Sequence, residues 1–276
     1  MMMMMVALTP LLSNAIHMKH RSDPFVACLT CGAEIPEART NDPIGCGPQS
    51  EEIADMWEKV KKLTPASDKF TDHTYQTMYG LFLMPWRTST KGPKLFEIGL
   101  GCDMDYGPGA SVKVWQTILP LVELWEAEYD AACVNKSRET GTLSDDVYTV
   151  TGDQGNATVV DRWVHESGGN YDIVIDDGGH KNSQIKTSFD GLWPHVKSGG
   201  LYFIEDLQVG RHPIWDDTKG KAVMADILED WVEQLLIKGH KARKFPVPKD
   251  VDFVFCQHEA CVIGKRKHIF PGAEWN

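Results

Sequence analysis

The chain has 276 residues, 42% of them hydrophobic, which is enough for one large domain with a buried core. Its formal net charge is −11, from 39 acidic and 28 basic residues, and this excludes nucleic acid and anionic membrane surfaces as expected partners. No apolar run reaches the roughly 20 residues that a membrane-spanning helix needs, so we predict no membrane span.

The N-terminal segment and the cysteines bear on location. Residues 1–16 are apolar but interrupted by Pro10, with no basic segment ahead of them, so we expect a disordered or truncated leader, with a secretory signal as the alternative. Seven cysteines are an odd number in a chain too large to need disulfides, which predicts reduced thiols and a cytoplasmic location. Cys28, Cys31 and Cys46 have spacings that could hold zinc without an evident fourth ligand; unrelated loop cysteines are the alternative.

The chain divides into two parts. Residues 1–66 are predicted to form an N-terminal extension that is irregular and then helical, and residues 67–276 form the main domain. The helix of the extension is expected over 50–63, where Ser50 can cap its first turn. The main domain is expected to open with a second helix over 72–84.

From residue 94 onward, short apolar strands alternate with helices, which indicates an α/β domain with a mainly parallel sheet. Strands are predicted at 94–99, 122–129, 146–152, 171–176 and 199–206, with two antiparallel strands within 252–265. Helices are predicted at 110–119, 157–167, 182–193 and 221–239. This order resembles the Rossmann-like, doubly wound seven-stranded sheet of class I S-adenosylmethionine-dependent methyltransferases, which ends in an antiparallel hairpin. Because fold does not imply function, the activity has to be argued from the sites.

A first candidate site follows the first strand, in "FEIGLGCDMDYGPGAS". Gly99 and Gly101 let the backbone turn sharply and approach a ligand. Glu97 precedes these glycines and no G-x-G-x-x-G follows, so the loop resembles motif I of methyltransferases rather than a pyrophosphate-binding loop. We therefore expect Glu97, Gly99 and Gly101 to contribute to binding S-adenosylmethionine; a glycine-rich turn without a ligand is the alternative.

The next two strands are expected to complete the nucleoside site. An acid at the end of the second strand would accept hydrogen bonds from ribose hydroxyls, and Glu126, Glu128 and Asp130 are the candidates. Glu128 is preferred because it lies nearest the strand's end; a solvated acidic strand end is the alternative. After the third strand, Asp153 and Gln154 lie where the adenine amine needs an acceptor.

A second candidate site follows the fourth and fifth strands, whose carboxyl ends should face one cleft. This arrangement brings Asp176 or Asp177 close to Glu205 and Asp206. Clustered carboxylates repel one another unless a cation neutralises them, and Mg²⁺ with oxygen ligands is the expected ion. His180 lies at a helix start, where a neutral imidazole could act as a general base. Helix capping and solvent contact are the alternatives for these residues.

Five stretches within roughly residues 68–210 carry a more specific resemblance: "DKFTDHTYQTMYG", "FEIGLG", "GDQ", "IDDGGH" and "YFIEDLQ". They resemble the metal-dependent sugar O-methyltransferases of the macrocin and mycinamicin type. That resemblance implies Mg²⁺ ligands at Asp177, Glu205 and Asp206 and a catalytic base at His180. Asp176 is counted with the cofactor-binding residues, with a role as an anchor of its strand as the alternative. Gly179 stands where that family often has a serine.

The predicted activity is transfer of a methyl group from S-adenosylmethionine to a hydroxyl of a sugar or polyol-bearing small molecule, as in secondary metabolism. Mg²⁺ would lower the pKa of the hydroxyl, and His180 would take its proton. The alternatives are a catechol-type metal-dependent O-methyltransferase, a methyltransferase-like binding protein without catalysis, and an NAD-dependent oxidoreductase. His73, Tyr75 and Tyr79 are expected to close over the methionine end or the substrate, with core packing the alternative for the tyrosines. Assembly into a homo-oligomer stays open.

Overall fold

The computed structural model describes residues 55–237 and 243–267. The predicted zinc site at Cys28, Cys31 and Cys46 and the predicted leader lie outside these residues. In the described part of the chain, no helix is long and apolar enough to cross a membrane. Residues 55–60 are helical, within the helix predicted for the extension, while the boundary at residue 66 stays a prediction.

The described residues contain a seven-stranded sheet with the order β3-β2-β1-β4-β5-β7-β6. Neighbouring strands are parallel except in the pairs β5–β7 and β6–β7. The strands are β1 (Lys94–Ile98), β2 (Glu123–Glu128), β3 (Tyr148–Thr151), β4 (Tyr171–Asp176), β5 (Val196–Ile204), β6 (Val251–Cys256) and β7 (Cys261–Lys265). The predicted doubly wound sheet with its terminal antiparallel hairpin is therefore confirmed.

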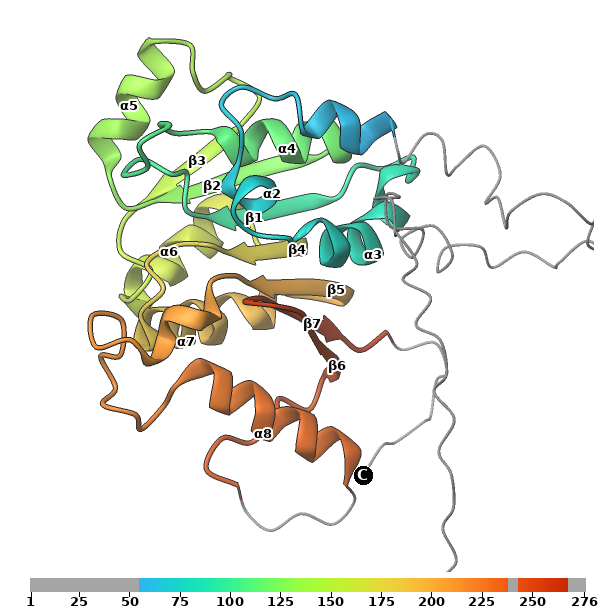
Figure 1. Cartoon of the computed structure of the whole chain (residues 1–276), viewed down its shortest axis with the longest axis vertical. Coiled ribbons are helices and arrows are strands. Elements are labelled where there is room, and N and C mark those ends of the chain that lie inside the picture. The colour runs from blue at the N-terminus through green and yellow to red at the C-terminus, as the bar shows by residue number, and fades with distance from the viewer. Residues whose placement is uncertain (1–54, 238–242, 268–276) are drawn as a thin grey trace, which may run out of the picture.

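Helices connect and cover these strands (Figure 1). They are α2 (Asp68–Thr71), α3 (Gln76–Arg87), α4 (Ala110–Ile118), α5 (Ala131–Glu139), α6 (Ala157–Ser167), α7 (Asn182–Leu192) and α8 (Met224–Leu236), with a 3₁₀ helix, η3 (Leu207–Arg211), after β5. Several of them differ from the sequence prediction, and the short helix α2 was not predicted. Helix α3 continues through Pro85 to Arg87, and α5 was not predicted at all. The N-terminus of α5 is capped by Asp130, whose side chain accepts hydrogen bonds from the backbone N–H groups of Ala132 and Cys133.

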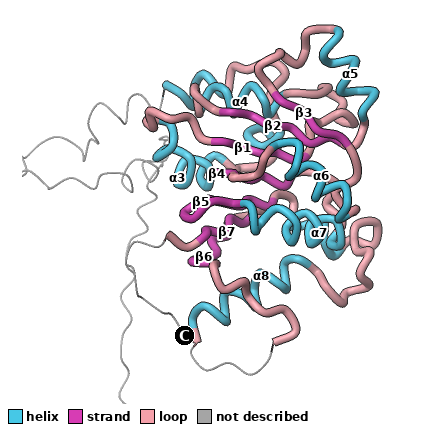
Figure 2. The backbone as a smooth tube through the Cα atoms, turned by 180° about the vertical axis from the view of Figure 1, so that it is seen from behind, coloured by secondary structure: helices cyan, strands magenta, loops and turns pink. Residues whose placement is uncertain are grey.

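Two apolar layers enclose the sheet, because successive strand residues face opposite sides. On one side Leu95 belongs to a core cluster with residues of α3 and α4, and on the other its neighbour Phe96 belongs to a cluster with residues of α6, α7 and α8. Figures 1 and 2 show the sheet between the helices from opposite directions, with α8 beside β6 at one end. Met56 and Val60 of the N-terminal helix are buried in the first cluster, so this helix is part of the same core.

The sheet register decides which functional side chains meet. Ile98 of β1 pairs with Ala127 of β2 and with Asp176 of β4, and Asp176 pairs in turn with Ile204 of β5. Four parallel strands therefore end at one edge of the sheet, and the residues that follow them are neighbours in space. Both predicted sites lie at this edge, as expected for a doubly wound sheet.

Candidate active site

A cavity of about 640 Å³ lies at the carboxyl edge of the sheet. Its wall is formed by the glycine-rich loop after β1, the ends of β2 and β3, the loop between β4 and α7, part of α2, and the residues Asp206 and Trp215 on either side of η3. Eight sequence-predicted site residues line it: Gly99, Gly101, Glu128, Asp153, Gln154, Asp177, His180 and Asp206. The structure thus brings most of the two predicted sites together in a single cavity.

The glycine-rich loop can follow this path only because of its glycines. Gly99 has a φ of 108°, which favours glycine, and a Cβ there would overlap the carbonyl oxygen of Asp177. The backbone N–H of Gly99 donates to the carbonyl of Ala127 in β2, at 2.8 Å. The loop is thereby held against the ends of both β2 and β4, with its backbone facing the cavity.

Glu128 is the best-placed acid at the end of β2. It is 8% exposed and lines the cavity, and its two carboxylate oxygens accept hydrogen bonds from the backbone N–H groups of Leu100 (3.1 Å) and Asp130 (2.9 Å). These bonds fix its orientation and leave further acceptor capacity for a ligand hydroxyl. Glu126 is fully buried and is not part of the cavity wall. The sequence-based preference for Glu128 is therefore consistent with the geometry.

Beyond β3, Gln154 links two parts of the site. Its side-chain oxygen accepts a hydrogen bond from the backbone N–H of Gly179 at 2.7 Å, and its amide nitrogen donates to Asp176 at 2.9 Å. Asp176 is 1% exposed, and it also accepts hydrogen bonds from Ser188 and Tyr202, on the side of the sheet covered by α7. It lies outside the cavity wall, and this position supports the reading as a strand anchor rather than direct cofactor contact.

Glu97 is likewise placed behind the cavity wall. It is fully buried, and one of its oxygens accepts hydrogen bonds from Ser111 and Trp115 of α4, both at 2.7 Å. The contacts position α4 against β1, directly under the glycine-rich loop. Glu97 therefore holds α4 against β1, and it is not part of the cavity wall.

Three side chains at the ends of β4 and β5 converge on the cavity. Asp177 Oδ1 lies 4.0 Å from His180 Nε2, and Asp206 Oδ2 lies 3.6 Å from the same nitrogen. One ligand atom from each of the three residues lies within 4.8 Å of the others. His180 (φ 54°) and Asp206 (φ 55°) both have the left-handed backbone conformation that is strained in residues other than glycine. His180 also packs edge-on against Trp215 of the cavity wall, with 5.9 Å between the ring centroids.

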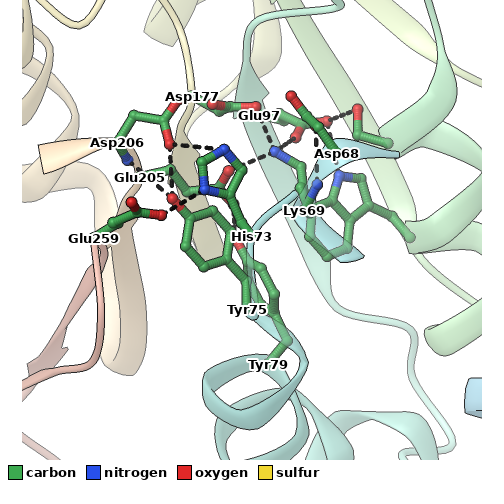
Figure 3. Close-up of polar contacts among 12 residues, drawn as sticks. Asp68, Lys69, His73, Tyr75, Tyr79, Glu97, Asp177, Glu205, Asp206 and Glu259 are labelled. Atoms are coloured by element: carbon green, nitrogen blue, oxygen red, sulfur yellow. Dashed lines mark hydrogen bonds and ion pairs between the residues drawn. The ribbon is translucent and has the colours of Figure 1, made fainter. Parts of the chain in front are cut away.

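A buried lysine holds the carboxylates beside this cluster, and the sequence analysis did not single it out (Figure 3). Lys69 of α2 is 1% exposed; its ammonium contacts Asp177 Oδ2, and it lies 2.7 Å from Glu205 Oε2 and 3.5 Å from Glu97 Oε1. Burial opposes the charge of Lys69, but the three carboxylates hold its pKa well above the usual value. The sequence feature that could have identified Lys69 is its position in the stretch "DKFTDHTYQTMYG", which carries part of the family resemblance.

Glu205 is the one predicted metal ligand that is not at the cavity surface. It is 1% exposed, and its oxygens are bound by Lys69 and by the hydroxyl of Tyr79. Tyr75 and Tyr79 are also buried, which supports core packing, yet each hydroxyl holds a carboxylate: Tyr75 donates to Asp206 at 2.7 Å. Burial opposes ionisation of Asp206, but the charge of His180 and the Tyr75 hydrogen bond lower its pKa.

The cysteines differ from the sequence-based expectation. Among the described residues, Cys102 and Cys133 form one disulfide and Cys256 and Cys261 form another, where reduced thiols were expected. The first joins the glycine-rich loop to α5, and the second joins β6 to β7. The partners of the first are 31 residues apart in the chain, so their spacing carried no signal before the fold brought them together.

Comparison with known proteins confirms the predicted resemblance. The chain is 30% identical over 172 residues to mycinamicin VI 2''-O-methyltransferase of Micromonospora griseorubida, covering 61% of this chain and 39% of that protein. It is 32% identical over 163 residues to 8-demethyl-8-alpha-L-rhamnosyl tetracenomycin-C 2'-O-methyltransferase of Streptomyces olivaceus, covering 57% and 40%. It is 32% identical over 139 residues to demethylmacrocin O-methyltransferase of Streptomyces fradiae, covering 49% and 33%. The match thus spans less than half the length of each of these relatives, and no family model matches the chain.

Solved structures support the fold assignment. The MycE methyltransferase of the mycinamycin biosynthetic pathway, in complex with Mg, SAH and mycinamycin VI, aligns with a TM-score of 0.60. The alignment has 23% sequence identity and covers 80% of this chain and 54% of MycE. At this sequence identity, the alignment establishes the methyltransferase fold alone. The activity of this chain has to be argued from its site.

Proposed function

We propose that this protein is an S-adenosylmethionine-dependent O-methyltransferase that acts on a hydroxyl of a sugar or polyol-bearing small molecule. The observation that carries the proposal is the convergence of Asp177 Oδ1, His180 Nε2 and Asp206 Oδ2 on one side of a cavity whose other side is the glycine-rich loop and Glu128. A nucleoside site and a carboxylate–histidine site within one cavity suit transfer of a group between two bound molecules.

The nucleoside half of the cavity suits S-adenosylmethionine. Glu128 is oriented by two backbone N–H groups at the end of β2, where ribose hydroxyls need acceptors. Asp153 and Gln154 lie one strand further, on the side proposed for the adenine. The likeness to MycE, whose structure contains SAH, supports this choice of cofactor.

The other half suits a divalent cation, for which Mg²⁺ is the proposed ion. Asp177 and Asp206 each have one carboxylate oxygen bound by protein donors, Lys69 for Asp177 and Tyr75 for Asp206, and a second oxygen that faces His180. Carboxylate oxygens are the ligands that Mg²⁺ prefers. We propose Asp177 and Asp206 as ligands. A direct role for Glu205, implied by the family resemblance, requires it to exchange its contact with Lys69 or Tyr79 for the ion.

The proposed chemistry divides between the bound groups and the protein. S-adenosylmethionine bound beside Glu128 would supply an electrophilic methyl group, and Mg²⁺ held by Asp177 and Asp206 would lower the pKa of the acceptor hydroxyl. His180 accepts the hydroxyl proton at Nε2, the nitrogen that faces both aspartates. Lys69 and Tyr75 hold those aspartates in place, and Trp215 fixes the edge of the imidazole.

The test is methyl transfer from isotopically labelled S-adenosylmethionine to a panel of glycosides and catechols, with and without Mg²⁺. We expect glycoside methylation that depends on Mg²⁺. We expect the H180N variant to lower kcat by about 10²–10⁴-fold, since this is the usual contribution of a general base, while S-adenosylhomocysteine binds as in the wild type. The matched control is H165N, on the exposed surface of α6. Full activity of H180N, or methylation of catechols alone, would contradict the proposal.

A further inference from the structure

The hairpin that ends the sheet reaches back to the active site through its turn. Residues 257–260 connect β6 to β7, and the disulfide between Cys256 and Cys261 closes this turn at its base. A backbone hydrogen bond from Gln257 to Ala260, at 2.9 Å, closes it further. Glu259 has a φ of 68°, a conformation that is uncommon for a residue with a side chain and that has to be held by its surroundings.

The turn is attached to two segments of the active site. The side chain of Gln257 accepts a hydrogen bond from the backbone N–H of Met78 (2.9 Å), in the first turn of α3, and donates to the carbonyl of Thr74 (3.0 Å), just before that helix. The carbonyl of Glu259 accepts a hydrogen bond from the backbone N–H of Leu207 at 2.8 Å. Leu207 directly follows Asp206, so the turn is hydrogen-bonded to the chain at a proposed metal ligand.

A row of side chains leads from the turn to that ligand (Figure 3). The carboxylate of Glu259 is 2.6 Å from His73 Nδ1, and His73 Nε2 is 3.6 Å from Asp206 Oδ1. The His73 ring stacks on the ring of Tyr75, with centroids 4.9 Å apart and 12° between the planes. The His73 imidazole and the Tyr75 hydroxyl therefore approach the same oxygen of Asp206, because the hydroxyl also donates to Oδ1.

The two carboxylate oxygens of Asp206 have different neighbours. Oδ1 faces His73 and Tyr75, whereas Oδ2 faces His180 and the cavity. The positive φ of Asp206 makes its backbone conformation costly, so neighbouring contacts have to hold this residue in place. Neither Glu259 nor His73 lines the cavity. Their side-chain contacts reach the site through Asp206, which does line the cavity.

We propose that Glu259, presented by the disulfide-closed turn, is a positioning residue that acts through His73 to aim the Asp206 carboxylate at the divalent cation. This rests on the proposed function in one respect, the presence of a cation at Asp177 and Asp206. Partners of this kind commonly tune metal affinity, because they limit the orientations of the ligand.

The test is calorimetric titration of the full chain with Mn²⁺, a divalent ion that prefers the same oxygen ligands. We expect E259Q to weaken Mn²⁺ binding about 10-fold, the lower end of the usual effect of such partners. The affinity for S-adenosylhomocysteine and the thermal midpoint should match those of E139Q, a control with the same substitution on the exposed side of α5. If Glu259 has a general structural role, E259Q will lower the Mn²⁺ affinity, the S-adenosylhomocysteine affinity and the thermal midpoint together. That outcome would overturn the proposal.

A double-mutant cycle tests the route through His73. H73N should weaken Mn²⁺ binding by a similar factor, and the double variant should bind no more weakly than either single one, since both changes interrupt the same contact. Additive losses, or wild-type affinity of E259Q, would overturn the proposal while leaving the methyltransferase assignment intact. Conversely, E259Q and H73N could weaken Mn²⁺ binding as expected while the wild-type chain transfers no methyl group. That outcome would contradict the proposed function and support the role of Glu259.

Discussion

Lys69 shows at the residue scale how much charge this protein buries. Its side chain is 1% exposed and lies among Glu97, Asp177 and Glu205, and its ammonium is also 5.9 Å from the ring centroid of Trp115. Burying an ion is costly, and removing one partner of a buried pair leaves the others without compensation. Lys69 therefore contributes to stability and to the arrangement of the site at once.

Replacing Lys69 by methionine tests this role. We expect K69M to lower the free energy of unfolding by about 3–5 kcal/mol, because three carboxylates lose their shared counter-ion. Urea denaturation measures the change. The control is K61M, because Lys61 is 65% exposed in its surface pair with Glu58 and its replacement should leave stability nearly unchanged. Equal stability of both variants would show that the carboxylates are not charged around Lys69.

Glu126 gives a pH-dependent prediction at the same scale. Burial and the neighbouring charge of Glu97 raise its pKa well above the usual 4.5. The folded state therefore keeps a proton that the unfolded chain releases above 4.5, so this group makes stability fall as pH rises toward its folded-state pKa. E126Q lacks this titration, and its stability relative to wild type should increase as pH rises above 4.5 toward the folded-state pKa of Glu126, as measured by denaturation at a series of pH values. A pH-independent difference would argue against a protonated Glu126.

At the element scale, the disulfide between Cys102 and Cys133 ties the glycine-rich loop to α5 beside the half of the cavity that is proposed to bind the nucleoside. Asp130 caps α5 and Glu128 ends β2 just before it, so the same helix end positions both acids. The bridge has one partner, Cys102, in the cavity wall. Its place indicates that it restrains the cavity wall.

Removing the bridge with C102S/C133S should lower the free energy of unfolding by about 3–4 kcal/mol in the chain-entropy model, given the separation of 31 residues. The affinity for S-adenosylhomocysteine, measured by calorimetry, should fall as well, because the loop and α5 are no longer joined. Wild-type protein treated with a dithiol reductant is the comparison and should show the same direction of change. Unchanged stability in both samples would mean that the bridge does not form in solution.

At the scale of the whole molecule, the acidic balance of the chain is also found in its cavity. Seven carboxylates line the wall, and among the lining residues Lys69 is the one lysine or arginine, already paired with carboxylates. Such a cavity attracts cationic ligands and repels anionic ones. S-adenosylmethionine, with its sulfonium and ammonium groups, suits this field.

The same field should act on the acceptor. We expect a neutral glycoside to be methylated with a higher kcat/KM than the same glycoside carrying a carboxylate on the sugar. The ratio of the two kcat/KM values should decrease as salt is added, because salt screens the charges of the cavity. Steady-state kinetics at several ionic strengths measure it. Equal kcat/KM for the two acceptors at low salt would contradict an electrostatic selection by the cavity.

Much of the architecture could be read from local sequence. Apolar strands alternating with helices predicted the sheet, because each element carries its own periodicity. Glycines and acids directly after strands predicted Gly99, Glu128, Asp177 and Asp206 as cavity residues, since parallel strands end at a common edge. Helix α5 was not predicted, because its mean hydropathy is low and it lacks an apolar periodicity. Its buried residues are Val134 and Ser137.

Contacts between distant residues could not be read in this way. Lys69 lies 108 residues from Asp177 and 136 from Glu205, and Glu259 lies 186 from His73. No local pattern records such pairs, because they form only when the packing of α2 and the terminal hairpin against the sheet edge brings them together. The sequence therefore specified the strands, the turns and the acids that end them. The folded chain determined which oxygen of each acid stays open to the cavity and which is held by a buried partner, because that choice depends on neighbours supplied by distant segments.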